Sequence, residues 1–261
     1  MILGISGKKQ AGKTTIANII HGFKLKNNGM VMDYKVNDKG KLIVNTKNAV
    51  GKEGWGEFDI ERKDEEFVEY AHYNMWPNVK LYNFADSLKD LCINLFGLTY
   101  DQAYGTDKQK NQKLTHIRWE DMPRHQNMNI MVKMPIDAKK SWGWREGEMT
   151  AREFMQFFGT DIMRKIHQDV WVNACINKIT KEGSGLAIVA DVRFPSEVEA
   201  INKAGGKVLR LERDVHKDDH DSETALDVEN FDHSKFWHVL DNGKMTIKDT
   251  IKKVDSLLEQ I

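Results

Sequence analysis

Runs of apolar residues without a helical period recur along the chain and mark the strands of a predicted sheet. The run at 186–190 is apolar throughout, which is typical of a strand that helices cover on both faces. Amphipathic segments separate the runs, so the pattern predicts an α/β fold: a three-layer sandwich with a five-stranded, mostly parallel sheet flanked by helices. The strands are expected near residues 2–6, 79–84, 186–190, 207–211 and 237–240.

Apolar residues at helical spacing predict the helices between these strands. One helix should run from residue 12 to about residue 24. Another, over 86–96, should be capped by Asp86 or Ser87 and end at Gly97.

A capping box predicts where a further helix begins. Thr150-x-x-Glu153 should open this helix and Gly159 should end it, while Thr160 with its neighbour Asp161 should cap the next one.

Two regions interrupt the alternation of strand and helix. Residues 30–78 begin with a predicted β-hairpin closed by the turn 37–40, and we interpret them as an insertion into a single domain. A surface hairpin or an oligomer contact is as consistent with this insertion as a role in catalysis. Residues 99–149 are polar and lack a clean period, which predicts irregular, partly mobile structure closing over bound substrates. A solvated loop without that duty is the alternative.

Composition favours a soluble protein that binds small molecules. The 261 residues are 40% hydrophobic, enough for one substantial core, and 39 basic side chains balance 39 acidic ones. Zero net charge gives no reason to expect a nucleic acid or a membrane as partner. No apolar stretch approaches the ~20 residues of a membrane span, and Cys92 and Cys175 fit buried reduced thiols, so a cytoplasmic location is expected.

The first strand leads directly into the strongest motif of the chain, Gly7-x-x-x-x-Gly12-Lys13-Thr14. Glycine allows the backbone to curl so that successive N–H groups converge on a phosphate, and the following helix adds its partial positive charge. Lys13 should reach the β- and γ-phosphates of a nucleotide, and the Thr14 hydroxyl should bind Mg²⁺. The expected nucleotide-binding residues are Gly7, Lys8, Gln10, Ala11, Gly12, Lys13, Thr14 and Thr15.

Further candidates lie near the carboxyl ends of other strands, where open α/β sheets bind ligands. Asp191 ends the strand at 186–190 and could hold a Mg²⁺-bound water or a substrate hydroxyl, with Arg193 in the same crevice. Lys89 lies in the first turns of the 86–96 helix, where an exposed helix lysine is the plainer interpretation. Arginine suits phosphate because it keeps its charge and presents a planar fork of donors. Polar or amphipathic candidates on the later helices are Arg152, Gln156, Arg164, Gln168 and Trp171.

Several of these motifs, in this order, resemble the bacteriophage deoxynucleoside monophosphate kinases. The resemblance covers most of the chain outside 30–78. It rests on the phosphate loop, Phe84-Ala-Asp-Ser-Leu-Lys89, Arg152-x-x-Met-Gln-x-x-Gly-Thr-Asp-x-x-Arg164, Asp169-Val-Trp-Val172, Asp191-Val-Arg-Phe-Pro-x-Glu197, His220-x-Ser-Glu223 and Asp241-Asn-Gly243. The phosphate loop alone is shared by many unrelated proteins, and the combination is more specific.

The resemblance implies one P-loop kinase domain over 1–261, with a lid and substrate-binding region at about 99–165. It implies transfer of the γ-phosphate of ATP to a deoxynucleoside monophosphate, with ATP and Mg²⁺ as cofactors and the host cytoplasm as location if a phage encodes the chain. Arg164 is the candidate that crosses to the transferring phosphoryl group, and Lys13, Asp191 and Arg193 complete the implied catalytic set. The implied monophosphate site comprises Lys89, Arg152, Gln156, Gly159, Thr160, Trp171, Asp191 and Arg193.

Alternatives stay open at the level of sequence. Family members often carry Asp after the loop lysine, whereas Thr14 here favours the ordinary Mg²⁺–hydroxyl arrangement. Another small-molecule kinase resembling dephospho-coenzyme A kinase would share the loop, and an NTP-driven switch or nucleic-acid-handling ATPase is the more distant alternative. A homodimer is compatible with the sequence, as the commonest soluble assembly.

Overall fold

The computed structural model describes residues 1–47, 50–62, 64–123, 145–213 and 224–261. The chain divides into two compact units, the first made of residues 1–84 and 171–261 and the second of residues 85–170. Each unit has its own hydrophobic core.

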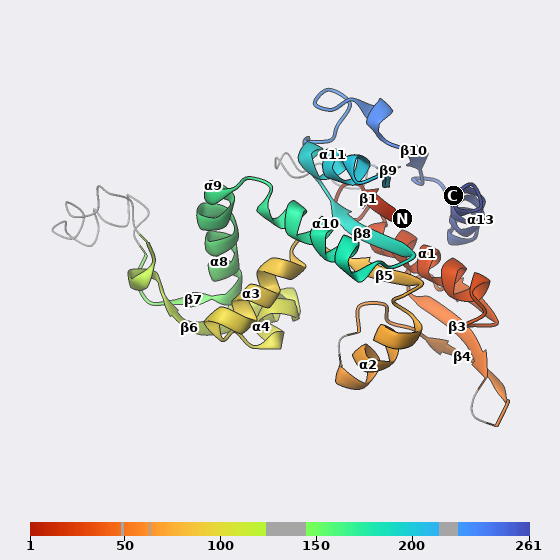
Figure 1. The fold of residues 1–261 in the computed structure, drawn as a ribbon, viewed down its shortest axis with the longest axis horizontal. Helices are drawn as coiled ribbons and strands as arrows, with labels where there is room; N and C mark the ends of the chain where they lie inside the picture. Colours follow the sequence, from red (N-terminus) through yellow and green to blue (C-terminus); the bar gives the residue numbers. More distant parts are fainter. Residues whose placement is uncertain (48–49, 63, 124–144, 214–223) are drawn as a thin grey trace. The chain divides into compact units, whose positions relative to one another are not determined.

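The first unit is built on the predicted sheet (Figure 1). Its strands are β1 (Ile2–Ser6), β5 (Val79–Tyr82), β8 (Leu186–Val192), β9 (Lys207–Glu212) and β10 (His238–Asp241), in the order β10-β9-β1-β8-β5. All neighbouring pairs are parallel, which confirms the predicted five-stranded sheet. Parallel pairing brings the carboxyl ends of all these strands to one edge, where ligands of such folds bind.

Helices cover both faces of this sheet (Figure 1). On one face, Leu3 and Ile5 of β1 pack in a cluster with α1 (Lys13–Asn27) and α13 (Ile247–Leu258). On the other face, Ile2 packs in a cluster with α10 (Val170–Glu182) and α11 (Pro195–Lys203). Successive strand residues point to opposite faces, so this alternation produces the predicted three layers.

The region 30–78 is more ordered than its sequence suggested. The predicted hairpin is present as β2 (Asp33–Val36) and β3 (Leu42–Lys47), and a third antiparallel strand, β4 (Glu53–Glu57), and helix α2 (Glu65–Asn74) follow. Buried Val36, Leu42 and Val44 belong to the same cluster as Ile16 of α1. The hairpin therefore contributes to the core of the first unit.

The second unit is helical with one small antiparallel sheet. It contains α3 (Asp86–Phe96), α4 (Tyr100–Tyr104), α5 (Asp107–Gln112), β6 (Leu114–Arg118), a 3₁₀ turn (Trp119–Asp121), β7 (Glu148–Thr150), α8 (Ala151–Gln156), a π-helix (Phe157–Met163) and α9 (Arg164–Ile166). Its core cluster includes Cys92, Met149 and Phe154. Cys92 and Cys175 are both buried and free, as expected from the sequence.

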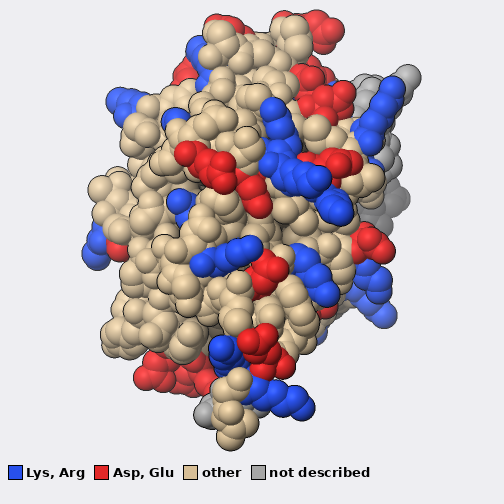
Figure 2. All heavy atoms as spheres, turned by 90° about the vertical axis from the view of Figure 1, so that its right-hand side faces the viewer, with Lys and Arg blue, Asp and Glu red and all other residues tan. Residues whose placement is uncertain are grey.

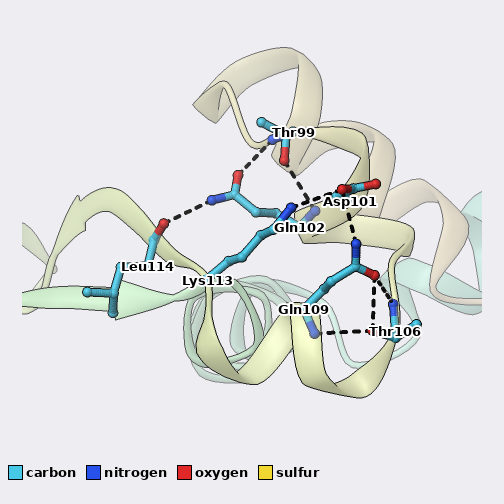
Figure 3. Close-up of polar contacts among 7 residues, drawn as sticks. All are labelled: Thr99, Asp101, Gln102, Thr106, Gln109, Lys113 and Leu114. Carbon is cyan, nitrogen blue, oxygen red and sulfur yellow. Dashed lines mark hydrogen bonds and ion pairs between the residues drawn. The ribbon is translucent and has the colours of Figure 1, made fainter.

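The expectation of irregular structure over 99–149 is wrong for the described part of that segment. Thr99 and Thr106 each open a short helix through a reciprocal capping box, in which Gln102 and Gln109 complete the hydrogen bonds (Figure 3). These boxes satisfy the first N–H groups of helices too short to show an apolar period. Residues 124–144 of the segment lie outside the described residues.

Three expectations about helix ends are also wrong. The N-cap of α3 is Ala85, without a side-chain cap, although Gly97 ends the helix in a left-handed conformation as predicted. Gly159 does not end a helix and Thr160 does not begin one, because the chain continues through the π-helix into α9. A Cβ atom on Gly159 would lie 2.7 Å from Cδ2 of Leu88, so glycine serves close packing at this position.

No helix within the described ranges has both the length and the apolar character required to cross a bilayer.

Candidate functional site

The glycine-rich loop lies at the carboxyl edge of the sheet, between the end of β1 and the start of α1. Gly12 has φ +95°, a left-handed conformation that favours glycine. A Cβ atom on Gly7 would lie 3.1 Å from the Cβ atoms of both Ala11 and Leu211. Backbone conformation at one glycine and close packing at the other therefore explain the two glycines of the motif.

The Lys13 side chain lies across this loop. Its Nζ donates to the carbonyl oxygens of Gly7 at 2.5 Å and Lys8 at 2.8 Å. Thr14, in the first turn of α1, is exposed, and Thr15 is half-buried. The loop thus has the Lys13 ammonium group lying across its backbone and an exposed threonine at its helical end.

A network of charged side chains connects the loop to strands β1 and β9. Arg210 of β9 is only 5% exposed, and its guanidinium donates to Ser6 Oγ at 3.1 Å and to Asp227 at 3.2 Å. The other carboxylate oxygen of Asp227 pairs with Lys8 Nζ at 3.0 Å. This network was not predicted from the sequence. The signal was an arginine among the apolar residues of a buried strand, a position that demands a charged partner.

A cavity of about 520 Å³ opens beside Lys8 at the ends of β9 and β10. Most of its wall is charged, with Leu211 and Val228 as the apolar exceptions. The lining residues are Lys8, Arg210, Leu211, Glu212, Arg213, Asp227, Val228, Glu229, His233 and Asp241.

Asp191 and Arg193 lie at the carboxyl end of β8, the strand next to β1. The Asp191 carboxylate accepts the backbone N–H of Phe84 at 3.1 and 3.3 Å, which joins the end of β8 to the residues after β5. The backbone N–H of Arg193 donates to buried Glu197 at 2.6 Å. Trp171, at the start of α10 in the same unit, is 5% exposed.

In the second unit, the Lys89 side chain is 21% exposed and lies between an aromatic ring and a carboxylate. Its Nζ lies 4.6 Å from the centre of the Tyr104 ring and 3.9 Å from the carboxylate of Asp86. The Tyr104 hydroxyl donates to Asp90 at 2.7 Å. Burial and the neighbouring Asp86 and Asp90 carboxylates raise the pKa of Tyr104, so it remains a neutral hydrogen-bond donor.

The other candidates of the second unit lie on α8, the π-helix and α9. Arg152 pairs with Asp107 at 2.6 Å, and the Asp107 side chain is 82% exposed. Gln156 and Thr160 are exposed, Arg164 is half-buried and Gly159 is buried.

The two units thus divide the predicted residues between them. The phosphate loop, Asp191, Arg193 and Trp171 belong to the first unit, while Lys89, Arg152, Gln156, Gly159, Thr160 and Arg164 belong to the second. The loop 220–223, which contributed to the resemblance, lies outside the described residues.

A parallel sheet covered by helices on both faces, with a glycine-rich loop between its first strand and first helix, is consistent with a P-loop kinase fold. Comparison with known proteins identifies the group: the model of the deoxynucleotide monophosphate kinase family matches residues 1–248. The chain belongs to the deoxynucleotide monophosphate kinase family. A protein of Acanthamoeba polyphaga mimivirus, provisionally named as such a kinase, is 26% identical over 158 residues, covering 55% of this chain and 67% of that protein.

Proposed function

We propose that the protein transfers the γ-phosphate of ATP to a deoxynucleoside monophosphate, giving the diphosphate for DNA synthesis and ADP. The observation that carries this proposal is the loop between β1 and α1, with the Lys13 ammonium lying across it. Family membership identifies a deoxynucleotide monophosphate kinase, and the glycine-rich loop with its lysine supports ATP as the proposed donor.

In the proposed donor site, Gly7, Lys8, Gln10, Ala11, Gly12, Lys13, Thr14 and Thr15 bind the phosphates of ATP. Lys13 now donates to two neutral carbonyls, and a phosphate oxygen would be the stronger acceptor because it is charged. Thr14 is exposed and would hold a Mg²⁺ ion through its hydroxyl, and that ion would neutralise part of the phosphate charge.

The cavity beside Lys8 is the proposed site of the donor nucleoside. Its carboxylates, such as Glu229 and Asp241, can accept hydrogen bonds from ribose hydroxyls, and Leu211 and Val228 offer apolar surface to a base. The cavity adjoins the phosphate loop within the same unit, so one ligand could occupy both.

The residues proposed to bind the acceptor include several cations. Lys89, Arg152, Gln156, Gly159, Thr160, Trp171, Asp191 and Arg193 bind the deoxynucleoside monophosphate. The acceptor phosphate is already an anion at neutral pH, so the reaction needs alignment and charge neutralisation more than a general base. Lys13, Arg164 and Arg193 supply this charge, and Asp191 orients the acceptor.

A nucleic-acid-handling ATPase is the alternative with the least support. Figure 2 shows one face of the molecule, on which basic and acidic side chains are interspersed. A basic stripe that could follow a phosphate backbone is not seen on that face. We therefore propose that the substrates are small molecules, ATP and a deoxynucleoside monophosphate. We also propose a cytoplasmic location, and a homodimeric assembly is compatible with this function.

The test is a coupled ADP-release assay with ATP, Mg²⁺ and one acceptor at a time: dAMP, dCMP, dGMP, dTMP or dephospho-coenzyme A, with a control lacking acceptor. ADP release that requires a deoxynucleoside monophosphate supports the proposal and identifies the accepted bases. Release only with dephospho-coenzyme A, or equal release without any acceptor, would replace the proposal by one of the alternatives.

A further inference from the structure

Asn242 connects the far end of the chain to the phosphate loop. It follows β10, and its Nδ2 donates to the carbonyl oxygen of Ala11 at 2.9 Å, across 231 positions of sequence. Both partners are buried, since Ala11 is 0% and Asn242 7% exposed. Asp241 fixes the turn that presents this amide by accepting the backbone N–H of Gly243 at 2.9 Å.

This hydrogen bond fixes the orientation of one peptide group of the loop. The Ala11 carbonyl belongs to the peptide that joins Ala11 to Gly12, and in a trans peptide the N–H points opposite to the C=O. Holding the Ala11 carbonyl against Asn242 therefore also sets the direction of the Gly12 N–H. On the preceding side, the Ala11 N–H donates to the Lys8 carbonyl at 3.1 Å, which closes the turn.

Asn242 makes this contact although it leaves its own acceptor unsatisfied. Its Oδ1 is buried and has no hydrogen-bond partner among the described residues. A buried acceptor without a partner costs free energy, which an apolar side chain of similar size would avoid. The bond to Ala11 is the contact that accounts for an amide at this position.

We infer that Asn242 is a positioning residue of the donor site, which orients the Ala11–Gly12 peptide so that the loop N–H groups can bind phosphate. The inference rests on the proposed donor site and adds a residue from outside the loop motif. Asn242 acts through the loop backbone and does not itself contact the nucleotide.

The test compares Asn242→Asp, Asn242→Ala and a matched control, Asn202→Ala. Asn202 of α11 also donates its Nδ2 to a distant backbone carbonyl, that of Lys235 at 2.9 Å, away from the loop. In Asn242→Asp the shape is kept but a carboxylate faces the carbonyl oxygen. Both Asn242 variants should raise the Kd of Mg·ADP, measured by calorimetry, and the KM for ATP by about tenfold, with the KM for the acceptor unchanged.

A second measurement needs no nucleotide. Hydrogen exchange of residues 7–15 should accelerate in both Asn242 variants and stay unchanged in Asn202→Ala. Normal exchange and normal ADP affinity in the Asn242 variants would overturn the inference, as would equal weakening of ADP binding in the Asn202 control. A wild-type chain that binds neither ATP nor ADP would overturn the donor site and the inference with it.

Discussion

The phosphate-loop edge of the first unit and the arginine-bearing helices of the second unit hold their polar groups in different ways. At the loop, Arg210 and Asn242 are buried and reach the loop or the strand before it through tertiary hydrogen bonds. On the helices, Arg152 pairs with Asp107, whose side chain is 82% exposed, and Gln156 is exposed. Buried contacts preset the geometry of the loop, whereas an exposed ion pair is weak, screened by salt and easily exchanged for a ligand.

This difference suggests that the two regions have different roles in the proposed reaction. The proposed donor side is organised before ATP arrives, and the proposed acceptor side acquires its final contacts with the deoxynucleoside monophosphate. Variants of the loop should therefore lower the rate of phosphoryl transfer, and variants of Arg152 and Gln156 on the helices should mainly change acceptor binding.

The largest effect is expected from Lys13→Ala. Removing the ammonium from the loop should lower kcat by about 10²–10³-fold, the usual loss when one preorganised charge at a transferring group is removed. Steady-state kinetics measures the loss, and a thermal melt by circular dichroism should show a folded protein. Lys24→Ala, at the other end of α1, is the control. Unchanged turnover in Lys13→Ala would reject the proposed role of this lysine.

The stability of the folded protein should depend on pH through His21, a buried residue of α1. Burial lowers the pKa of His21 to about 4, while a hydrogen bond with the Ala17 carbonyl at 3.3 Å partly opposes this shift. Between the ordinary pKa near 6.5 and this value, the unfolded chain binds a proton that the folded chain does not, so stability falls as pH falls. From about pH 8 to about pH 5 the loss should be about 2 kcal/mol.

Urea unfolding at several pH values measures this loss, and His21→Met should remove it because the variant has no imidazole at that position. An identical pH dependence in wild type and His21→Met would show that other groups cause it.

On the helices, Arg152→Ala should raise the KM for the acceptor about tenfold and leave the KM for ATP unchanged, because one charge-assisted hydrogen bond to phosphate is lost. Asp107→Asn is the matched variant. It frees Arg152 from its ion pair and should change stability by less than about 0.5 kcal/mol, since the pair is exposed. An Arg152→Ala variant that changed only the KM for ATP would contradict the proposed role of these helices in acceptor binding.

A modest loss of stability is expected from Gly159→Ala in the π-helix. The new Cβ would lie 2.7 Å from Leu88 Cδ2, so the Leu88 side chain must shift. Overpacking costs ~1–3 kcal/mol, and alanine recovers ~1 kcal/mol of helix propensity, which leaves a net loss of ~1 kcal/mol in urea unfolding. Gly159→Ala in a Leu88→Ala background should lose nothing, and a loss of the same size there would exclude Leu88 as the cause.

Sequence patterns predicted some features of the fold correctly and missed others. The strands of the sheet, the loop motif and the Thr150 capping box are local patterns, and the structure contains them as predicted. Gly159 was misinterpreted because a helix stop and a close contact with Leu88 require the same residue type. The short helices α4 and α5 were missed since capping, at Thr99 and Thr106, and not an apolar period, defines them.

Consecutive residues encode an α/β protein with a phosphate loop after its first strand, so local patterns were enough to predict both features. Which distant groups support that loop depends on the tertiary fold. Asp227 bridges Arg210 and Lys8, and Asn242 holds the Ala11 carbonyl. No spacing rule joins these residues, since they meet only when parallel strands bring their carboxyl ends to one edge of the sheet.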